Sequence, residues 1–473
     1  MQGNPRVSII IVNFNGRHLL DDCLTSLENL DFPENEFEVI LVDNNSSDDT
    51  IPYLSKYFPW VHVIQSNENL GFTGGNELGL QHAKGEYIVL LNSDVEVDRD
   101  WLKSLLEAAK PKNVGIVSSK LRFAIPFVEV SLKSRVIPKS QINHGIDHSP
   151  VGILVEEVIC EDSTLNSLVY YKDGFYDKNE GEVCMRRTKG PAHILLPFPK
   201  NNSRHSFTFT IHGYESSDKK PIDVELSVGS EKMKFQILPF EVKQFDFVLE
   251  KKNIQKELKW LIQNAGNIVL SNGYSKDRGS LIDLHDNEVR EFYEEESAYF
   301  EKPAKLLAAC GASCLIKRDV IKDIGFLDGH YFMYYEDVEY SVRAWKAGWD
   351  VVYEPTAVGY HKHRSTTGNT ESIFLVEHLE RNHLAFVITH FPLTTVFNQL
   401  LLFVLRLGMA YMKSFVFQFR DNVNRTATWH RKYQGRKAAF KFILFSLPRL
   451  FTSRQGLKKL FKENRKAFDA YLY

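Results

Sequence analysis

The sequence contains few cysteines, and they show no regular spacing. The five that occur in 473 residues are Cys23, Cys160, Cys184, Cys310 and Cys314. An odd and scattered set argues against a disulfide framework and predicts a reducing compartment. Cys310 and Cys314 lack a second ligand pair and a histidine at zinc-finger spacing, so we interpret them as small packing residues rather than metal ligands.

Other absences narrow the class of protein further. The net charge is only −2, which excludes a disordered polyelectrolyte. No signal-peptide core follows Met1, and the cleanest C-terminal apolar run, at 400–405, is far shorter than a membrane span of about 20 residues. Neither a Gly-x-Gly-x-x-Gly fingerprint nor a Gly-Lys-Ser/Thr phosphate loop occurs. The sequence therefore predicts a cytoplasmic protein that uses neither of these nucleotide-binding motifs.

The N-terminal part alternates between strand-like and helix-like patterns. Apolar runs at 7–12, 37–42, 61–64 and 87–91 have the composition of buried parallel strands, and amphipathic segments separate them. Such alternation implies βαβ crossovers and an α/β fold. A polar cluster follows each run, so one crevice at the carboxyl ends of the strands can collect all of these clusters.

Asp94 ends the most prominent of these clusters. A carboxylate at the end of a buried strand is suited to a hard cation, Mn²⁺ or Mg²⁺, which binds through one or two carboxylates and substrate phosphates. A nucleotide diphosphate is then the natural partner. Asp43, after the second strand, can accept hydrogen bonds from a base or ribose. An ordinary turn or helix cap remains the alternative for such an Asp.

A different pattern occupies residues 128–258. Apolar and polar residues alternate with a period of two, and turn-forming clusters separate the alternating segments. We predict an inserted antiparallel β-sandwich that binds glycan or a partner enzyme, or serves as a spacer. The inward-facing residues expected are Phe207, Phe209, Ile211, Val224, Leu226, Val228, Phe245 and Phe247.

The C-terminal segment, 386–473, combines apolar stretches with many basic residues. Interleaved Lys, Arg and apolar side chains are typical of helices that lie on an anionic membrane leaflet. A dimerisation bundle with a solvated basic face is the alternative. Nothing in the segment matches a nucleic-acid-binding motif, so we expect no nucleic-acid partner.

Ten short motifs together resemble a known family. The chain resembles the inverting family 2 glycosyltransferases with the GT-A fold, and within them the rhamnosyltransferase-like branch that builds bacterial surface polysaccharides. The similarity covers roughly half of the chain in two blocks. The motifs lie at 7–16, 42–47, 69–76, 90–94, 261–266, 309–318, 325–328, 332–339, 360–361 and 381–382.

The resemblance implies a GT-A domain, a Rossmann-like nucleotide-diphospho-sugar transferase fold, with an inserted all-β sandwich and a C-terminal helical tail. Residues 1–127 would be its nucleotide-binding half, 128–258 the insert, 259–385 the acceptor and catalytic half, and 386–473 the membrane-associated tail. The Gln-x-x-Arg-Trp motif of processive relatives is absent.

The same resemblance implies roles for individual residues. Asp337 matches the catalytic base and Glu336 would orient the acceptor or the base, although an acidic first helical turn also explains both. Asp94 and His361 would hold the metal, with Asn92 in place of the first Asp of the Asp-x-Asp motif. The donor-binding residues implied are Asn13, Asp43, Asn69, Gly71, Gly75, Asn92, His363, Arg364 and Arg381. A helix-surface salt bridge is the alternative for Arg381.

The expected activity is inverting sugar transfer from a nucleotide-diphosphate donor, dTDP-rhamnose-like or a UDP-hexose, to a saccharide or lipid-linked saccharide. It would serve cell-surface polysaccharide synthesis on the inner face of the cell membrane, with Mn²⁺ or Mg²⁺ as cofactor. Homo-oligomer formation stays open. The alternative is a non-catalytic glycan-binding or scaffold protein with a degenerate transferase fold.

Overall fold

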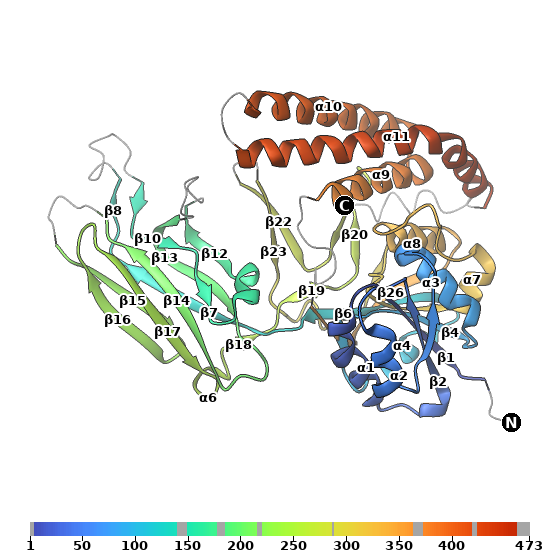
Figure 1. The fold of residues 1–473 in the computed structure, drawn as a ribbon, viewed down its shortest axis with the longest axis horizontal. Coiled ribbons are helices and arrows are strands. Elements are labelled where there is room, and N and C mark those ends of the chain that lie inside the picture. Colours follow the sequence, from blue (N-terminus) through green and yellow to red (C-terminus); the bar gives the residue numbers. More distant parts are fainter. Residues whose placement is uncertain are drawn as a thin grey trace. The chain divides into compact units, whose positions relative to one another are not determined.

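The computed structural model describes residues 4–139, 149–176, 185–214, 220–285, 288–362, 372–418 and 423–460. The chain forms two compact units (Figure 1). The first unit combines Met1–Ala124, Ile262–Ser280 and Ser297–Tyr473, and the second combines Ile125–Leu261 and Leu281–Glu296. The sequence analysis placed 281–296 in the transferase half, whereas these residues are part of the second unit.

The first unit is built on a mixed sheet with the strand order β24-β26-β6-β25-β4-β1-β2-β3. Four strands from the N-terminal segment are parallel to one another: β1 (Val7–Asn13), β2 (Phe37–Asp43), β3 (His62–Gln65) and β4 (Tyr87–Asn92). Their carboxyl ends therefore meet at one edge, as the polar clusters predicted. The α/β fold expected from the sequence is confirmed.

The remaining strands of this sheet come from later in the chain. β25 (Ser313–Lys317) runs antiparallel between β4 and β6 (Val114–Phe123). β26 (Asp350–His361) is parallel to β6 and also pairs with the short strands β5 (Val95–Val97) and β24 (Ala304–Leu306). The antiparallel β5–β26 pairing sets His361 opposite Val95, next to Asp94.

Helices cover both faces of the sheet. Ile9 and Ile11 share one core with α1 (Leu20–Glu28) and α4 (Trp101–Ala108). Ile10 faces the opposite way, into a core that includes residues of α7 (Arg318–Ile324) and α8 (Glu336–Lys346). Because successive strand residues point to opposite faces, a strand covered on both sides must be apolar throughout. This explains the Val-Ile-rich run at 7–12, in which Ser8 is the one polar residue.

The second unit is rich in antiparallel strands, and its buried residues form one core. The alternating segments of the sequence are β14 (Arg204–His212), β15 (Ile222–Val228) and β17 (Val242–Glu250), and each buries every second side chain in its apolar stretch. The long partners β7 (Phe127–Ser134) and β13 (Met185–Pro197) pair antiparallel with each other. The expected additional β-rich region is confirmed.

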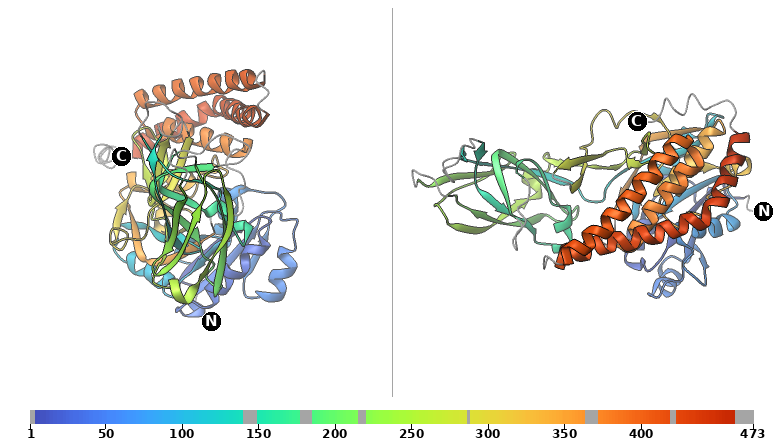
Figure 2. Two further views of the ribbon diagram at one scale, coloured as in Figure 1. Left: turned by 90° about the vertical axis from the view of Figure 1, so that its left-hand side faces the viewer. Right: turned by 90° about the horizontal axis from the view of Figure 1, so that it is seen from above.

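Three long helices end the described chain: α9 (Ile373–His390), α10 (Leu393–Gln418) and α11 (Val423–Leu460) (Figure 2). The expected helical C-terminal region is confirmed. The stretch Leu393–Val416 is 24 residues long with a mean hydropathy of 1.5, so length and composition alone would allow it to cross a membrane. The stretch contains two cations, Arg406 and Lys413, but the many Leu, Phe and Val residues around them keep its mean hydropathy high.

Candidate active site

The ends of the parallel strands bring three predicted donor-site residues together. Asn13 and Asp43 are opposite each other in the β1–β2 register, and Asn92 lies one position away on β4. Asn13 donates to Thr50 Oγ1 at 3.2 Å, and Asp43 Oδ2 accepts from the Ser46 backbone N–H at 3.1 Å. In the described part of the chain, Asn13 Oδ1 and Asp43 Oδ1 are buried without a hydrogen-bond partner. Buried acceptors of this kind favour a ligand that brings N–H donors.

The entry to α3 (Gly71–His82) packs too tightly for side chains at two of its glycines. Asn69 Oδ1 accepts from the Gly71 N–H at 2.9 Å. Gly71 has a φ of +68°, and a Cβ there would lie 2.4 Å from the Phe332 carbonyl oxygen. A Cβ on Gly75 would lie 2.7 Å from Val12 Cγ1. The packing alone therefore requires both glycines, and their contact with a ligand stays a prediction.

Asp94 and His361 form a close, nearly buried pair. Asp94 Oδ1 lies 3.1 Å from His361 Nε2, and His361 Nδ1 lies 2.9 Å from Gln263 Oε1. Burial alone would lower the pKa of His361, but the Asp94 carboxylate outweighs it and holds this pKa above its usual value. The Gln263 contact orients the imidazole, so Nε2 faces the carboxylate.

These two groups suit a shared divalent cation. Ligands about 2.1 Å from an octahedral Mg²⁺ lie about 3 Å apart when adjacent, and Asp94 Oδ1 and His361 Nε2 are separated by 3.1 Å. The described residues contain no cluster of three or more His, Cys, Asp or Glu side chains able to hold a metal. A pair of protein ligands completed by phosphate oxygens and water is the usual arrangement for Mg²⁺ beside a nucleotide.

A chain of polar side chains connects this pair to Asp337. Asp277 lies 3.4 Å from Gln263 Nε2 and accepts from Asn264 Nδ2 at 2.8 Å. Asn264 also donates to Asn267 Oδ1 at 3.0 Å, and Asn267 donates to Asp337 Oδ2 at 3.2 Å. The predicted metal ligands and the predicted base are thus parts of one hydrogen-bonded arrangement within the first unit.

Asp337 lies in the first turn of α8 and is held by three donors. Oδ2 accepts from the Gly311 N–H at 2.8 Å and from Asn267, and Oδ1 accepts from the Val338 N–H at 2.7 Å. Burial raises the pKa of Asp337, whereas these donors oppose the rise. Part of its surface stays exposed, as a base that meets an acceptor hydroxyl requires.

Glu336 differs from its neighbour in environment. Its side chain is buried, and Oε2 has no hydrogen-bond partner among the described residues. Burial, followed by the charge of Asp337, raises the pKa of Glu336 well above its usual value. The pKa of Glu336 is thus shifted upward more strongly than that of Asp337, whose three donors oppose the effect of burial.

The backbone before this pair is strained and held by α9. Tyr334 and Tyr335 have φ values of +69° and +71°, a conformation that costs non-glycine residues about 1–2 kcal/mol each. Asn382 is fully buried, and its amide donates to the carbonyls of Met333 and Tyr334, both at 2.8 Å. These two bonds fix the turn that aims Glu336 and Asp337.

The remaining predicted donor-site residues are less clearly connected to the site. Arg381 forms an ion pair with Glu377 at 3.5 Å and stacks over the Phe442 ring, 4.2 Å from its centroid. Its ion pair with Glu377, four residues away on the same helix, matches the salt-bridge alternative, although Arg381 itself is buried rather than on the surface, and its role toward phosphate stays a prediction. His363 and Arg364 lie outside the described residues.

Sequence reasoning assigned no role to the polar chain or to Asn382. Gln263, Asn264 and Asn267 belong to or adjoin the motif at 261–266, and the signal available was their polarity in a segment that is otherwise apolar and small. Asn382 likewise follows Arg381 in a recognised motif. Asp277 carries no sequence signal, because its contacts depend on the hairpin of β20 (Asn267–Val269) with β21 (Ser275–Asp277).

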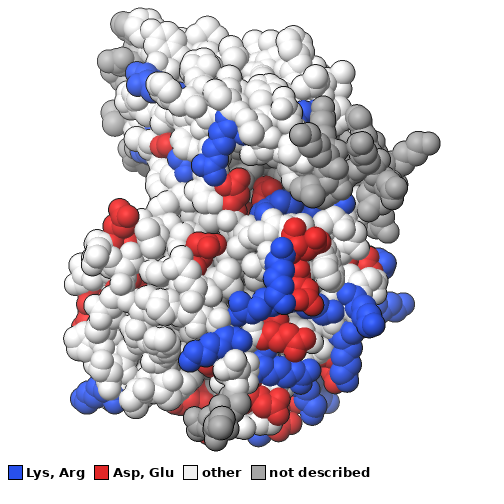
Figure 3. All heavy atoms as spheres, turned by 90° about the vertical axis from the view of Figure 1, so that its right-hand side faces the viewer, with Lys and Arg blue, Asp and Glu red and all other residues white. Residues whose placement is uncertain are grey.

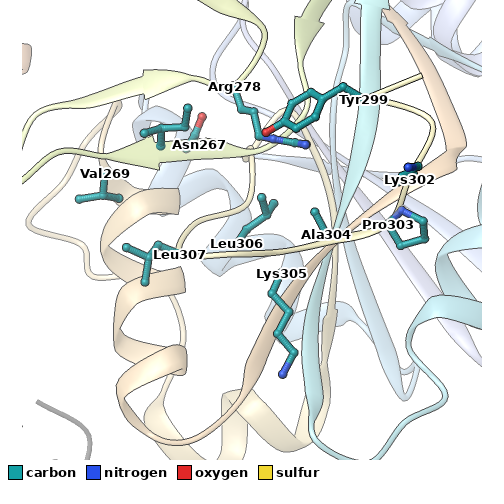
Figure 4. A pocket seen from close by; sticks show the side chains of 11 residues that line it. Asn267, Val269, Arg278, Tyr299, Lys302, Pro303, Ala304, Lys305, Leu306 and Leu307 are labelled. Atoms are coloured by element: carbon teal, nitrogen blue, oxygen red, sulfur yellow. The ribbon is translucent and has the colours of Figure 1, made fainter. Parts of the chain in front are cut away.

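A pocket of about 260 Å³ adjoins Asn267 (Figure 4). Arg278, Tyr299, Lys302 and Leu306 are among the residues that line it. The Arg278 guanidinium stacks on Tyr299, 4.6 Å from the ring centroid. The pocket is thus lined by aromatic, aliphatic and cationic groups. Asn267, which also lines it, contacts Asp337.

Two segments of the chain match glycosyltransferase family models. Residues 8–146 match the model described as Glycosyl transferase family 2, and residues 252–388 match the one described as Glycosyltransferase like family 2. The chain is therefore similar to family 2 glycosyltransferases over these two segments. Together with the mixed sheet, this makes the first unit a GT-A-like α/β transferase domain, as expected from the resemblance.

Characterised relatives match parts of the chain. A poly(ribitol-phosphate) beta-glucosyltransferase of Bacillus spizizenii is 30% identical over 28% of this chain and 21% of its own length. A Campylobacter jejuni GalNAc(5)-diNAcBac-PP-undecaprenol beta-1,3-glucosyltransferase is 32% identical over 22% of this chain and 35% of its own. The structure of Staphylococcus aureus TarS 1–349 with UDP-GlcNAc is 28% identical over 24% of this chain and 34% of that one, with a TM-score of 0.23. The chain thus spans about a fifth to a third of these relatives.

Proposed function

We propose that the protein is an inverting glycosyltransferase that moves a sugar from a nucleotide-diphosphate donor to a saccharide or lipid-linked saccharide acceptor. The observation that carries the proposal is the polar chain from Asp94 and His361 to Asp337. It joins a site suited to a diphosphate-bound cation with a carboxylate suited to activate a hydroxyl. An inverting glycosyl transfer needs these two functions on opposite faces of the same anomeric carbon.

In the proposed reaction the acceptor hydroxyl oxygen attacks the anomeric carbon while the bond from that carbon to the phosphate oxygen breaks. The Asp337 carboxylate takes the hydroxyl proton, and the nucleoside diphosphate leaves with the bonding electrons. Glu336, neutral beside it, can donate a hydrogen bond to the acceptor or to Asp337. Asn267 and the Gly311 N–H keep the Asp337 carboxylate oriented.

The proposed metal site consists of Asp94 and His361. A bound Mn²⁺ or Mg²⁺ would supply positive charge to the diphosphate leaving group. Gln263 holds the His361 ring in the required orientation through its 2.9 Å contact. Asn92, where relatives by resemblance carry an acidic residue, contributes no charge, so the site depends on the donor phosphates for part of its affinity.

The nucleotide end of the donor is proposed to bind at Asn13 and Asp43. Their unpartnered oxygens suit the ring N–H of uracil, thymine or guanine, all of which present a donor there. A UDP-hexose and a dTDP-rhamnose-like sugar both meet this requirement. The UDP-GlcNAc in the TarS structure favours the first of these.

The acceptor is proposed to approach from the side of the pocket beside Asn267. Tyr299 offers an aromatic face on which a sugar ring can stack, and Arg278 and Lys302 suit anionic groups. Two relatives, named for transfer to poly(ribitol-phosphate) and to an undecaprenol-linked saccharide, favour an acceptor of this polymeric or lipid-linked kind. Cell-surface polysaccharide synthesis is the process proposed.

The first test is nucleotide binding followed by donor hydrolysis. UDP, dTDP and GDP are compared by thermal shift with Mn²⁺ and with a chelator, and the matching sugar nucleotides are then scored for slow release of the free diphosphate. At a ligand concentration of about 100 times Kd, binding should stabilise the native state by about 2.7 kcal/mol. Metal-dependent binding with hydrolysis of one donor supports the proposal. Absence of all binding would contradict it and favour the non-catalytic scaffold alternative.

A further inference from the structure

One face of α10 is apolar and exposed along its whole described length. Outward-facing positions recur on every turn, and this surface carries no acidic or basic side chain. In the part of the helix whose side chains are described, the large exposed apolar residues are Leu393, Phe397, Leu401, Leu402, Val404, Leu405, Met409, Tyr411, Met412, Phe415 and Val416. Only 22% of the most apolar 18-residue stretch within Leu393–Val416 is buried. A core helix of a soluble protein would show the opposite proportion.

The opposite stripe of α10 packs on α9 and α11. Phe403 stacks on Phe440 with centroids 6.4 Å apart, and Tyr411, although 56% exposed, contacts Tyr433 with centroids 5.3 Å apart. Arg406 donates to Glu380 of α9 at 3.0 Å, so this cation points inward rather than to the exposed face. The second unit has no part in these contacts, which all lie within Ser297–Tyr473.

Lys413, the other cation of α10, is also turned away from the exposed face. Its ammonium lies over the Trp429 ring of α11, 4.2 Å from the centroid. Both cations of α10 therefore lie on the inner stripe, and the exposed face has none. On the face drawn in Figure 3, charged residues are sparse in the upper part and numerous in the lower part.

The packing argues against a helix that crosses the bilayer. α10 and α11 are antiparallel neighbours, because Phe403 pairs with Phe440 whereas Tyr411 pairs with Tyr433. If α10 crossed, α11 would have to enter the hydrocarbon beside it, with Lys437 and Lys441 exposed on its surface. Each such charge costs about 2.5–3.5 kcal/mol at the centre of a membrane helix. A helix lying along the surface avoids this cost.

We propose that the exposed face of α10 is a membrane-binding surface that lies in the plane of an anionic lipid leaflet. At 1.5 Å per residue, 24 residues give a helix about 36 Å long that can bury one apolar side in the headgroup and acyl boundary. The exposed cations of α11, Lys437 and Lys441, complement anionic headgroups. The occupant is therefore lipid, and α10 rather than the basic tail provides the apolar contact.

This proposal does not depend on the transferase activity. A catalytically silent protein would bind lipid through the same face, and an active enzyme with a soluble acceptor would not need it. Vesicle binding therefore tests the membrane proposal, donor hydrolysis tests the transferase proposal, and either result can be negative without the other.

The test is co-flotation of the full chain with vesicles of phosphatidylcholine containing phosphatidylglycerol, compared with phosphatidylcholine alone. The double variant Phe397→Glu/Leu405→Glu places two charges on the α10 face, where the native residues are 67% and 56% exposed. Its matched control is Phe240→Glu/Leu238→Glu in the second unit, where the residues are 69% and 55% exposed. Chemistry and exposure are thus equal, and only the location differs.

We expect the wild type and the control to float with anionic vesicles and the α10 variant to lose at least about tenfold in bound fraction, equivalent to about 1.4 kcal/mol. Circular dichroism on each variant confirms that the helices remain. Equal flotation of the α10 variant and the control, or no flotation of the wild type, would overturn the proposal. So would a wild-type dimer that becomes a monomer in the α10 variant without a change in flotation, since a second copy would then be the occupant.

Discussion

Replacing Asn382 with alanine removes the two hydrogen bonds that hold the backbone in front of Asp337. The amide of Asn382 donates to the carbonyls of Met333 and Tyr334 at 2.8 Å, and the side chain is fully buried. Each of these two part-buried hydrogen bonds contributes about 0.5–1.5 kcal/mol, so we expect a loss of about 1–3 kcal/mol in the free energy of unfolding. Typical domains have about 5–15 kcal/mol, so the variant should remain mostly folded.

The activity should fall more specifically than the stability. Without Asn382, Tyr334 and Tyr335 can relax from their left-handed conformation, and the carboxylate of Asp337 then shifts. A misplacement of about 1 Å costs on the order of 100-fold in rate. We therefore expect the turnover number to fall by about 10- to 100-fold. Nucleotide affinity should stay unchanged, because the residues proposed to bind the nucleotide base lie on β1 and β2, away from this turn in the sequence.

Urea unfolding, nucleotide titration and donor hydrolysis measure the three quantities. Asn29→Ala is the matched control. The side-chain amide of Asn29 also donates a hydrogen bond, to the Thr25 carbonyl at 2.8 Å, but in an exposed position. It should lose less than about 1 kcal/mol and keep full activity. If Asn382→Ala behaves like Asn29→Ala in both assays, the turn is not what positions the catalytic pair.

Three further predictions follow from the same residues. Glu336→Gln should retain activity within about tenfold, because glutamine mimics the neutral acid; a loss as large as that expected for a base, about 100-fold or more, would show that Glu336 acts ionised. Asp43→Ala should weaken nucleotide binding by about 10- to 100-fold in a titration, and unchanged affinity would remove Asp43 from the base site. Burial lowers the pKa of His378, His383 and His390 to about 4 each from an ordinary 6.5, so the unfolded chain binds more protons below pH 6.5 and stability should fall as the pH drops from about 6.5 to 4. At pH 5 the more deeply buried His383 and His390 each lower the free energy of unfolding by about 2 kcal/mol relative to pH 7, and His378 by less. His390→Gln should therefore reduce the difference in the free energy of unfolding between pH 7 and pH 5, measured with urea; an unchanged difference would contradict this.

Much of the transferase fold follows from local sequence patterns. Strands buried on both faces leave long apolar runs, and the polar residues after Val12, Val42 and Leu91 predicted which ends of the strands meet. The period-two alternation around Phe207 similarly predicted the β-rich region. These features are visible because each depends on the surroundings of a single segment.

Features that depend on distant contacts were not accessible. Asp277 joins the site only because a short hairpin returns it to Gln263 and Asn264. The assignment of 281–296 to the second unit likewise depends on long-range packing. The apolar content of α10 was visible, but which of its sides is covered by α9 and α11 was not.

Arg381 illustrates a related difficulty. Its motif suggested a phosphate contact, whereas its described contacts are with Glu377 and Phe442. A long side chain on a helix can reach in several directions, and sequence spacing does not say which one it takes. The pairing with Phe442, 61 residues further along, comes only from the packing of α9 on α11.

The central claim is that Asp337 is the base of a glycosyl transfer. The most direct measurement is the turnover of the Asp337→Asn variant on the sugar nucleotide that the wild type hydrolyses, together with its affinity for the free nucleotide. Asparagine keeps the size of the side chain but cannot take a proton, so we predict a fall of about 100- to 10,000-fold in turnover with nucleotide affinity within about threefold of wild type. Turnover close to wild type would contradict the assignment, and with it the link between the metal pair and the acceptor.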